Sequence, residues 1–142
     1  MTAPNVYLLA DEVWNRLDAL PAVNTYRGEI DGTPPTDPDG RVHAYAIAYF
    51  GAGQPQAMRL DGGARGLRWT FQVTCVGGDD VRALWCINEV RGVLLGVRVP
   101  VGTGRVSGKV REVTDPGPLR RDDDVSPSRM YLPLQFGVYI AG

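Results

Sequence analysis

The sequence predicts an α+β fold: a single domain in which a mainly antiparallel, twisted sheet of roughly four to six strands carries two helices on one face. Three observations predict it. The chain has 142 residues, the length of one ordinary domain. Several segments alternate apolar and polar side chains as strands do, and two others repeat apolar side chains every three or four residues. The strands follow one another through loops, with one helix between two groups of strands, so we expect one mainly antiparallel domain over residues 1–142.

Two segments have the spacing of amphipathic helices. The first covers residues 5–19, and Pro21 ends it. The second runs from about Asp79 to Leu95, after an acidic GGDD turn that suits a helix N-terminus and before Gly96. The apolar face of the first helix consists of Val6, Leu9, Val13, Leu17 and Leu20.

The second predicted helix is apolar around most of its circumference. Only Arg82 and Glu89 mark a side that is plainly wet. Such a helix must be covered on two sides, and one sheet covers only one of them. We expect the first helix to cover part of the remainder and a neighbouring subunit to cover the rest, with Trp85 and Glu89 as candidate contact residues.

The clearest strand is LRWTFQVTC at 67–75, whose alternation places Cys75 in the core. Cys86, the other cysteine, is expected to be a buried thiol as well. Pro133 cannot donate to a ladder, so the start of the last strand should lie at a sheet edge. The predicted strands span residues 23–30, 42–50, 67–75, 97–101, 105–113 and 130–140.

Composition and charge exclude several classes of function. Fifteen basic and sixteen acidic side chains nearly balance, so nothing in the bulk charge calls for tight binding to nucleic acid or to an anionic membrane. The N-terminus lacks the basic region of a signal peptide, and the chain has no run of apolar residues long enough for a membrane helix. We therefore expect a protein that is made and kept in a cytoplasm.

Motifs for catalysis or cofactor binding are weak. His43 is the only histidine, whereas triads and zinc sites mostly need more than one. The segment GTGRVSGKV at 102–110 lacks the spacing of a phosphate loop and is interpreted as a hairpin. TDPDG carries Asp37 and Asp39 in the order of a calcium-binding loop. The first and twelfth ligand positions would be Pro35 and Ala46, which have no side-chain oxygen, so a solvated turn is expected. We expect no catalytic residue, no cofactor and no metal.

The segment RRDDDVSPSRMYLP, at 120–133, holds three adjacent carboxylates among arginines. In an extended chain Asp122 and Asp124 converge while Asp123 points away, which makes a weak metal site without a third ligand. Three interpretations stay open: a solvated loop, a contact between subunits, and a metal or catalytic site. The candidate contact residues are Arg120, Arg121, Asp122, Asp123, Asp124, Arg129 and Tyr131.

Three pieces of the sequence together resemble a known family. They are the strand, turn and helix at 67–96, the Arg-Asp-Asp-Asp run followed by proline at 121–127, and the aromatic-rich strand RMYLPLQFGVYI. In these the chain resembles the tail terminator, or tail completion, proteins of long-tailed bacteriophages with non-contractile tails. The resemblance implies a small α+β subunit that forms a ring, in that family a hexamer, and caps the head-proximal end of the tail tube. It implies no catalytic residues.

The resemblance also implies partners and a location. The partners would be further copies of the chain, the major tail-tube protein, the head-tail connector and genomic DNA passing through the bore, in a virion assembled in the host cytoplasm. Loops 31–41 and 51–66 are longer than connections need be and would reach toward tube, connector or bore. The alternatives are a connector or neck protein and, remotely, a divalent-metal enzyme using Asp122 and Asp124. The candidate loop residues, which a plain solvated loop would also explain, are Arg59, Asp61, Arg65 and Arg68.

Overall fold

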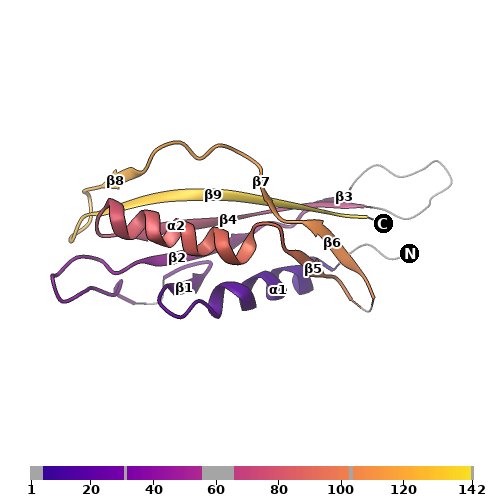
Figure 1. Ribbon diagram of the computed structural model, residues 1–142, viewed down its shortest axis with the longest axis horizontal. Coiled ribbons are helices and arrows are strands. Elements are labelled where there is room, and N and C mark those ends of the chain that lie inside the picture. Colours follow the sequence, from indigo (N-terminus) through magenta and orange to yellow (C-terminus); the bar gives the residue numbers. More distant parts are fainter. Residues whose placement is uncertain (1–4, 31, 56–65, 103, 142) are drawn as a thin grey trace.

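Two helices lie on one face of a twisted, mainly antiparallel sheet, as Figure 1 shows. This arrangement confirms the predicted α+β fold. Helices α1 (Val6–Asp18) and α2 (Asp80–Leu94) lie close to the two predicted helical ranges. In the described part of the chain, neither helix has the length and apolar character needed to cross a membrane. The computed structural model describes residues 5–30, 32–55, 66–102 and 104–141.

The sheet is built on two long central strands, β4 (Leu67–Gly77) and β9 (Arg129–Ile140), which pair antiparallel along the whole of β4. The strand order is β1-β2-β4-β9-β7, with β3 paired to the start of β4 and β8 paired to the start of β9. β1 runs parallel to β2, and the other described pairs are antiparallel. The shorter strands are β1 (Asn24–Arg27), β2 (Tyr45–Phe50), β3 (Gln54–Pro55), β7 (Arg111–Glu112) and β8 (Arg120–Asp122).

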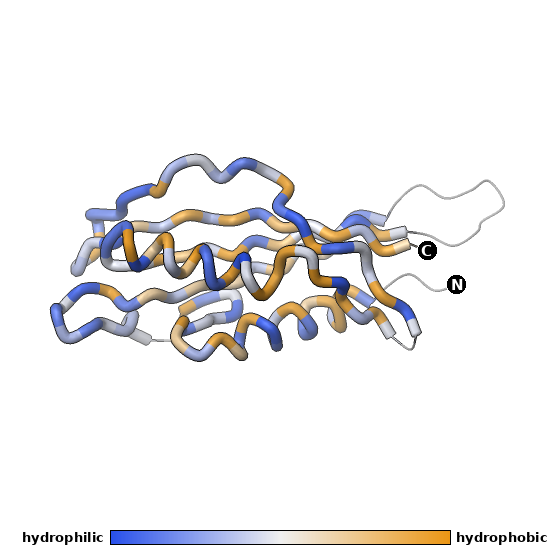
Figure 2. Tube along the Cα trace, in the orientation of Figure 1, coloured by the Kyte–Doolittle hydropathy of each residue, from blue (hydrophilic) through white to orange (hydrophobic). Residues whose placement is uncertain are grey.

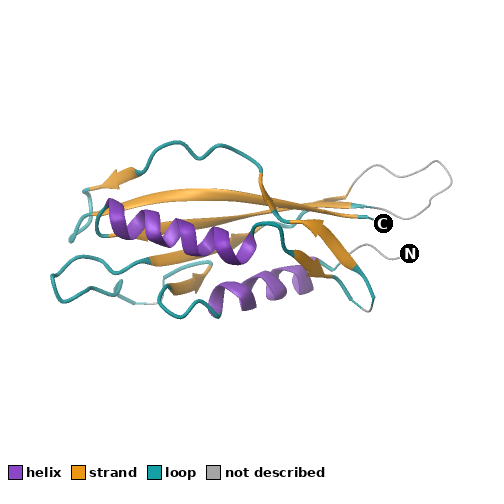
Figure 3. Cartoon of the chain, in the orientation of Figure 1, coloured by secondary structure: helices purple, strands orange, loops and turns teal. Residues whose placement is uncertain are grey.

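A separate two-stranded hairpin, β5 (Arg98–Pro100) with β6 (Val106–Lys109), follows α2 (Figure 3). This confirms the hairpin predicted at 102–110. The single strand predicted at 105–113 is wrong, because the chain turns at the buried Val110 and leaves the hairpin to join the main sheet as β7. The buried residues Ser107 and Val110 are three positions apart, so strict alternation does not hold through this segment.

Pro133 lies in the middle of β9 and pairs with Thr74 of β4. The start of β9 is not at an edge, because Arg129 and Tyr131 also pair with β8 on the other side. Between β8 and β7, however, the described strands leave that side of β9 open, and Pro133 lies in this gap. The edge predicted from proline is therefore local, and it does not extend to the beginning of the strand.

The main core lies between the helices and the sheet. Trp69 of β4 is fully buried, and its ring lies 4.9 Å from that of Phe71, which in turn lies 5.4 Å from Phe136 of β9. The indole nitrogen of Trp69 donates to the carbonyl of Gly51 at 2.7 Å, so this polar atom is satisfied inside the core. Figure 2 shows apolar residues in both helices and along the central strands.

Both cysteines are buried free thiols, as predicted. A hydrogen bond with Cys86 and burial together raise the pKa of the Cys75 thiol well above its ordinary value. A thiol in this environment stays protonated and packs as a small apolar side chain.

A smaller apolar cluster lies on the opposite face of the sheet, which carries no helix. It forms because β2 alternates small and large residues. Ala46 and Ala48 face the helices, while Tyr45 and Ile47 face outward and join Val76 of β4. The outer face of the sheet therefore carries apolar side chains that are themselves buried.

Candidate functional site

The RRDDD segment forms β8 and the turn that leads into β9. The register pairs Arg120 with Tyr131 and Asp122 with Arg129, so these side chains share the outer face of the sheet. Arg121, which lies between them in β8, pairs with Met130 and points to the other side. The structure thus places the predicted contact residues together at one end of β9.

Within this cluster the three carboxylates have different partners. Asp123 accepts a hydrogen bond from the guanidinium of Arg121 at 2.7 Å, with both side chains largely exposed. Asp122 accepts from the backbone N–H of Asp124 at 3.1 Å. Among the described residues neither Asp122 nor Asp124 forms an ion pair, and no three His, Cys, Asp or Glu side chains gather as metal ligands would. The negative charges of Asp122 and Asp124 are thus not neutralised by an ion pair among the described residues.

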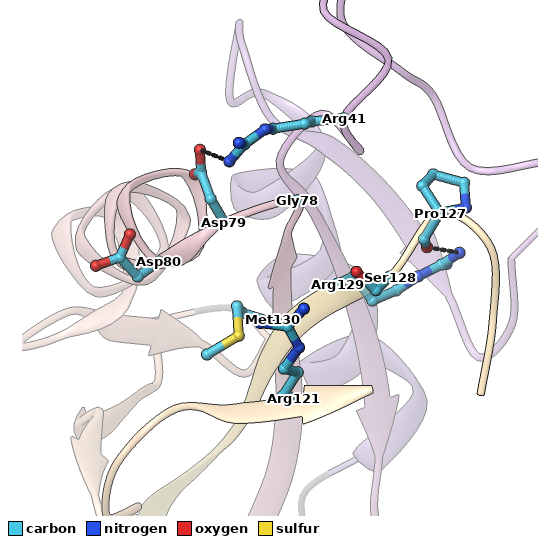
Figure 4. A pocket seen from close by; sticks show the side chains of 9 residues that line it. All are labelled: Arg41, Gly78, Asp79, Asp80, Arg121, Pro127, Ser128, Arg129 and Met130. Carbon is cyan, nitrogen blue, oxygen red and sulfur yellow. Dashed lines mark hydrogen bonds and ion pairs between the residues drawn. The ribbon is translucent and has the colours of Figure 1, made fainter. Parts of the chain in front are cut away.

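Arg129 does not neutralise these aspartates. One of its terminal nitrogens donates to the hydroxyl of Tyr45 at 3.1 Å, and the other donates to the carbonyl of Pro127 at 3.2 Å. Beside it a hollow of about 520 Å³ opens between the start of α2 and the turn before β9 (Figure 4). The residues that line this hollow are Arg41, Gly78, Asp79, Asp80, Arg121, Pro127, Ser128, Arg129 and Met130.

Next to this hollow, one arginine holds three aspartates. Arg82 of α2 forms ion pairs with Asp37 at 2.7 Å, with Asp39 at 2.7 Å and with Asp79 at 2.6 Å. Arg41 adds a further pair with Asp79 at 3.1 Å. These contacts attach the loop before β2 to the first turn of α2. The turn predicted at 36–40 is present and mostly exposed, and its two aspartates bind Arg82.

This network lowers the pKa of all three carboxyl groups. The hydrogen bond from Arg82 is the largest cause for Asp37. The backbone N–H of Arg41, followed by Arg82, lowers the pKa of Asp39, and the backbone N–H of Arg82 lowers that of Asp79. From the sequence, Arg82 is predicted only to lie on the solvent-exposed side of a helix, since two of its three partners, Asp37 and Asp39, lie more than forty residues away.

His43 has a structural position in the same region. Its Nδ1 lies 2.8 Å from the carboxylate of Asp37, and its Nε2 lies 2.8 Å from the carbonyl of Ala22. Both ring nitrogens are therefore engaged in fixing the segment that leads into β2.

A stripe of exposed apolar side chains runs along α2, directly opposite its buried face. Val81 is 69% exposed, Leu84 54% and Trp85 38%, and Leu95 is also exposed just past the helix, beyond Asn88 and Gly92 on the same side. At about 100° per residue these positions fall on one arc, and the buried positions fall on the other side of the helix. The buried positions are Ala83, Cys86, Ile87, Val90 and Leu94.

The stripe agrees with part of what the sequence predicted. α2 is apolar on two sides, and the sheet and core cover one of them. Glu89, the other candidate contact residue on this helix, is half-buried beside the stripe. Cover by a neighbouring subunit stays a prediction.

A second hollow, of about 360 Å³, lies on the outer face of the sheet near the end of β9. Arg68 of β4 pairs with Tyr139, and Arg111 of β7 pairs with Gly137, so the two guanidinium groups border the same hollow. Sequence reasoning selected Arg68 but missed Arg111, whose place depends on the unexpected strand β7. Arg59, Asp61 and Arg65, the other loop candidates, lie outside the described residues.

Comparison with known proteins identifies the fold. The chain is similar to one from the virion of a native gene transfer agent particle, with 17% identity, a TM-score of 0.58, and coverage of 94% of this chain and 95% of that one. A second solved structure, whose name states no function, has 21% identity, a TM-score of 0.54, and coverage of 97% and 96%. The sequence matches no known family in a scan and no curated protein in a search. The chain therefore shares the fold of a chain found in a virion particle.

Proposed function

We propose that this chain is a structural virion protein that forms a ring, most simply a hexamer, at the head-proximal end of a phage tail tube. There it would stop polymerisation of the tube and provide the surface for attachment of the head. The observation that carries the proposal is the exposed apolar stripe on α2. The similarity of fold to a chain of a gene transfer agent virion supports the particle context.

The stripe supports assembly because a group of large apolar side chains exposed together on one side of a helix is a feature of interaction surfaces. Leu84 and Trp85 are consecutive residues, each about one turn after Val81, and Trp is among the residue types that most often dominate binding at protein interfaces. A ring uses two different patches on each subunit, closed by rotation, so the stripe needs only one complementary patch on the next copy. A stable contact of this kind buries at least about 1,000 Å² in total.

The proposed partners follow from this role. They are further copies of the chain, the major tail-tube protein on one ring face and the head-tail connector on the other. Genomic DNA would pass through the bore without sequence-specific contacts. The role uses no catalytic residue and no cofactor.

The ring is tested by native mass measurement of the purified protein, alone and with assembled tail-tube protein of the same particle. We expect closed oligomers, or oligomers that form at tube ends and stop further tube growth. A chain that stays monomeric in both settings and leaves tube length unchanged contradicts the proposal. Binding to portal-side proteins instead of tubes would assign the chain to the neck.

The contribution of the stripe is tested with Leu84→Gln and Trp85→Gln. Both side chains are exposed in the single chain, so we expect little change in the midpoint of thermal unfolding but about a tenfold or greater loss of association. Tyr7→Gln on α1 is the matched control, because Tyr7 is 70% exposed and lies off the stripe. Equal losses of association in all three variants would remove α2 from the interface.

A further inference from the structure

One surface of the molecule carries unpaired opposite charges at its two ends. This is the outer face of the sheet, which no helix covers. Figure 1 shows β8 and the start of β9 at one end of the long axis, and the end of β9 with the hairpin β5–β6 at the other. The two ends differ in the charge that is free to bind.

The basic end is the hollow bordered by Arg68 and Arg111. Both side chains are exposed, and within the described part of the chain neither guanidinium has an ion-pair or hydrogen-bond partner. None of the described residues that line the hollow carries a carboxylate. Tyr139, 49% exposed, forms one wall, and the side chain of Val113 packs against the backbone of Gly137 beside the arginines. The hollow is thus shaped for an acidic group with some apolar contact.

The acidic end holds Asp122 and Asp124. Asp123 is already paired with Arg121, whereas the carboxylates of Asp122 and Asp124 have no ion pair among the described residues. Arg120 shares the outer face with Asp122, yet the two do not form an ion pair. Figure 2 shows that hydrophilic residues also dominate the neighbouring loop before β2.

The two ends cannot meet within one chain. Asp122 lies opposite Arg129, and Arg68 lies opposite Tyr139, ten residues further along β9. At about 3.3 Å per residue the separation is roughly 33 Å, far beyond the roughly 4 Å of an ion pair. Charges that are complementary but lie at opposite ends of one subunit fit a head-to-tail contact between copies.

We propose that the hollow at Arg68 and Arg111 receives the Asp122 and Asp124 turn of the next copy, so that subunits join head to tail along this face. The proposal rests on the ring of the proposed function. It names a second contact between neighbouring subunits, in addition to the contact made by the α2 stripe. In this contact the carboxylates of Asp122 and Asp124 form ion pairs with the arginines of the neighbouring subunit.

Charge reversal tests the pairing. One variant carries Arg68→Asp with Arg111→Asp, and the other carries Asp122→Arg with Asp124→Arg. Each alone places like charges at the contact, so we expect about a tenfold or greater loss of self-association, measured by sedimentation at low salt. An equimolar mixture of the two variants should recover association. The acidic hollow of one variant then meets the basic turn of the other, and the basic hollow meets the acidic turn. The matched control is Arg98→Asp with Lys109→Asp, the same change of charge at the same end but outside the hollow.

Each result supports or overturns the pairing. Loss in both variants with recovery in the mixture supports it. Rings of unchanged mass in both variants overturn it and leave the proposed function standing. A wild-type chain that is monomeric alone and on tubes overturns both. Loss of binding to duplex DNA in the Arg68 and Arg111 variant, without a change in mass, would assign the hollow to nucleic acid instead.

Discussion

At the scale of single residues, Arg82 forms more ion pairs than any other described residue. Its guanidinium forms ion pairs with three carboxylates, two of which come from the loop before β2. The five donors of an arginine are arranged so that it can bind several carboxylates at once, which a lysine could not do in the same geometry. Arg82 therefore anchors the loop to α2, and the Arg41–Asp79 pair adds a second contact.

Acid should weaken this anchor. The folded chain lowers the pKa of Asp37, Asp39 and Asp79, so their contribution to the free energy of unfolding is complete above the unfolded pKa of about 4 and is lost as pH falls through the folded pKa values. We expect Arg82→Met to lower the unfolding midpoint at neutral pH and to flatten its fall between about pH 5 and pH 2.

The control for this measurement is Arg120→Met, since Arg120 is also exposed but forms no ion pair among the described residues. Thermal unfolding of the three proteins across the pH series is the measurement. Parallel curves for the Arg82 variant and the wild type would show that the network contributes nothing to stability.

At the scale of elements, the junction between β4 and α2 allows no side chain. A Cβ added at Gly77 would lie 2.4 Å from the backbone nitrogen of Ala83, and one at Gly78 would lie 2.6 Å from that of Val42. These glycines let α2 start directly on the sheet, with Asp79 as its N-cap. The GGDD motif therefore does more than form a turn.

Two glycine substitutions should act in opposite directions. Gly77→Ala should lower the free energy of unfolding by about 1–3 kcal/mol, because the added carbon meets backbone atoms that cannot move independently. Gly92→Ala, within α2 and with no atom near the added carbon, should raise it by about 0.5–1 kcal/mol. Chemical denaturation measures both. Similar changes in the two variants would contradict the close packing at Gly77.

At the scale of the whole molecule, stability should be highest along the pairing of β4 with β9. These strands hold the longest register, and most of their inward residues, such as Trp69 and Leu134, are fully buried. β1 and β3 are short, and among the described strands each pairs along one side only. We expect amide hydrogen exchange to be slowest in β4 and β9 and fastest in β1 and β3. Slower exchange in β1 than in β4 would contradict this ranking.

The whole molecule also shows where prediction from sequence succeeds. Alternation located the inner face of β4, and the spacing of apolar residues located both helices, because these patterns depend on neighbours along the chain. The exposed stripe on α2 was likewise visible as an apolar excess. The unpredicted strands β3, β7 and β8 are two or three residues long, too short for any period to appear.

The sequence by itself determined the fold class, the two helices, the buried cysteines and the location of the acidic run. Only the tertiary structure decided which charges pair. It joined Arg82 to Asp37 and Asp39, placed Arg111 beside Arg68, and left Asp122 and Asp124 without partners among the described residues. The physical reason is that the side-chain periodicity of helices and strands depends only on residues that are near one another in the sequence. An ion pair depends on the register and packing of segments that are far apart in the chain.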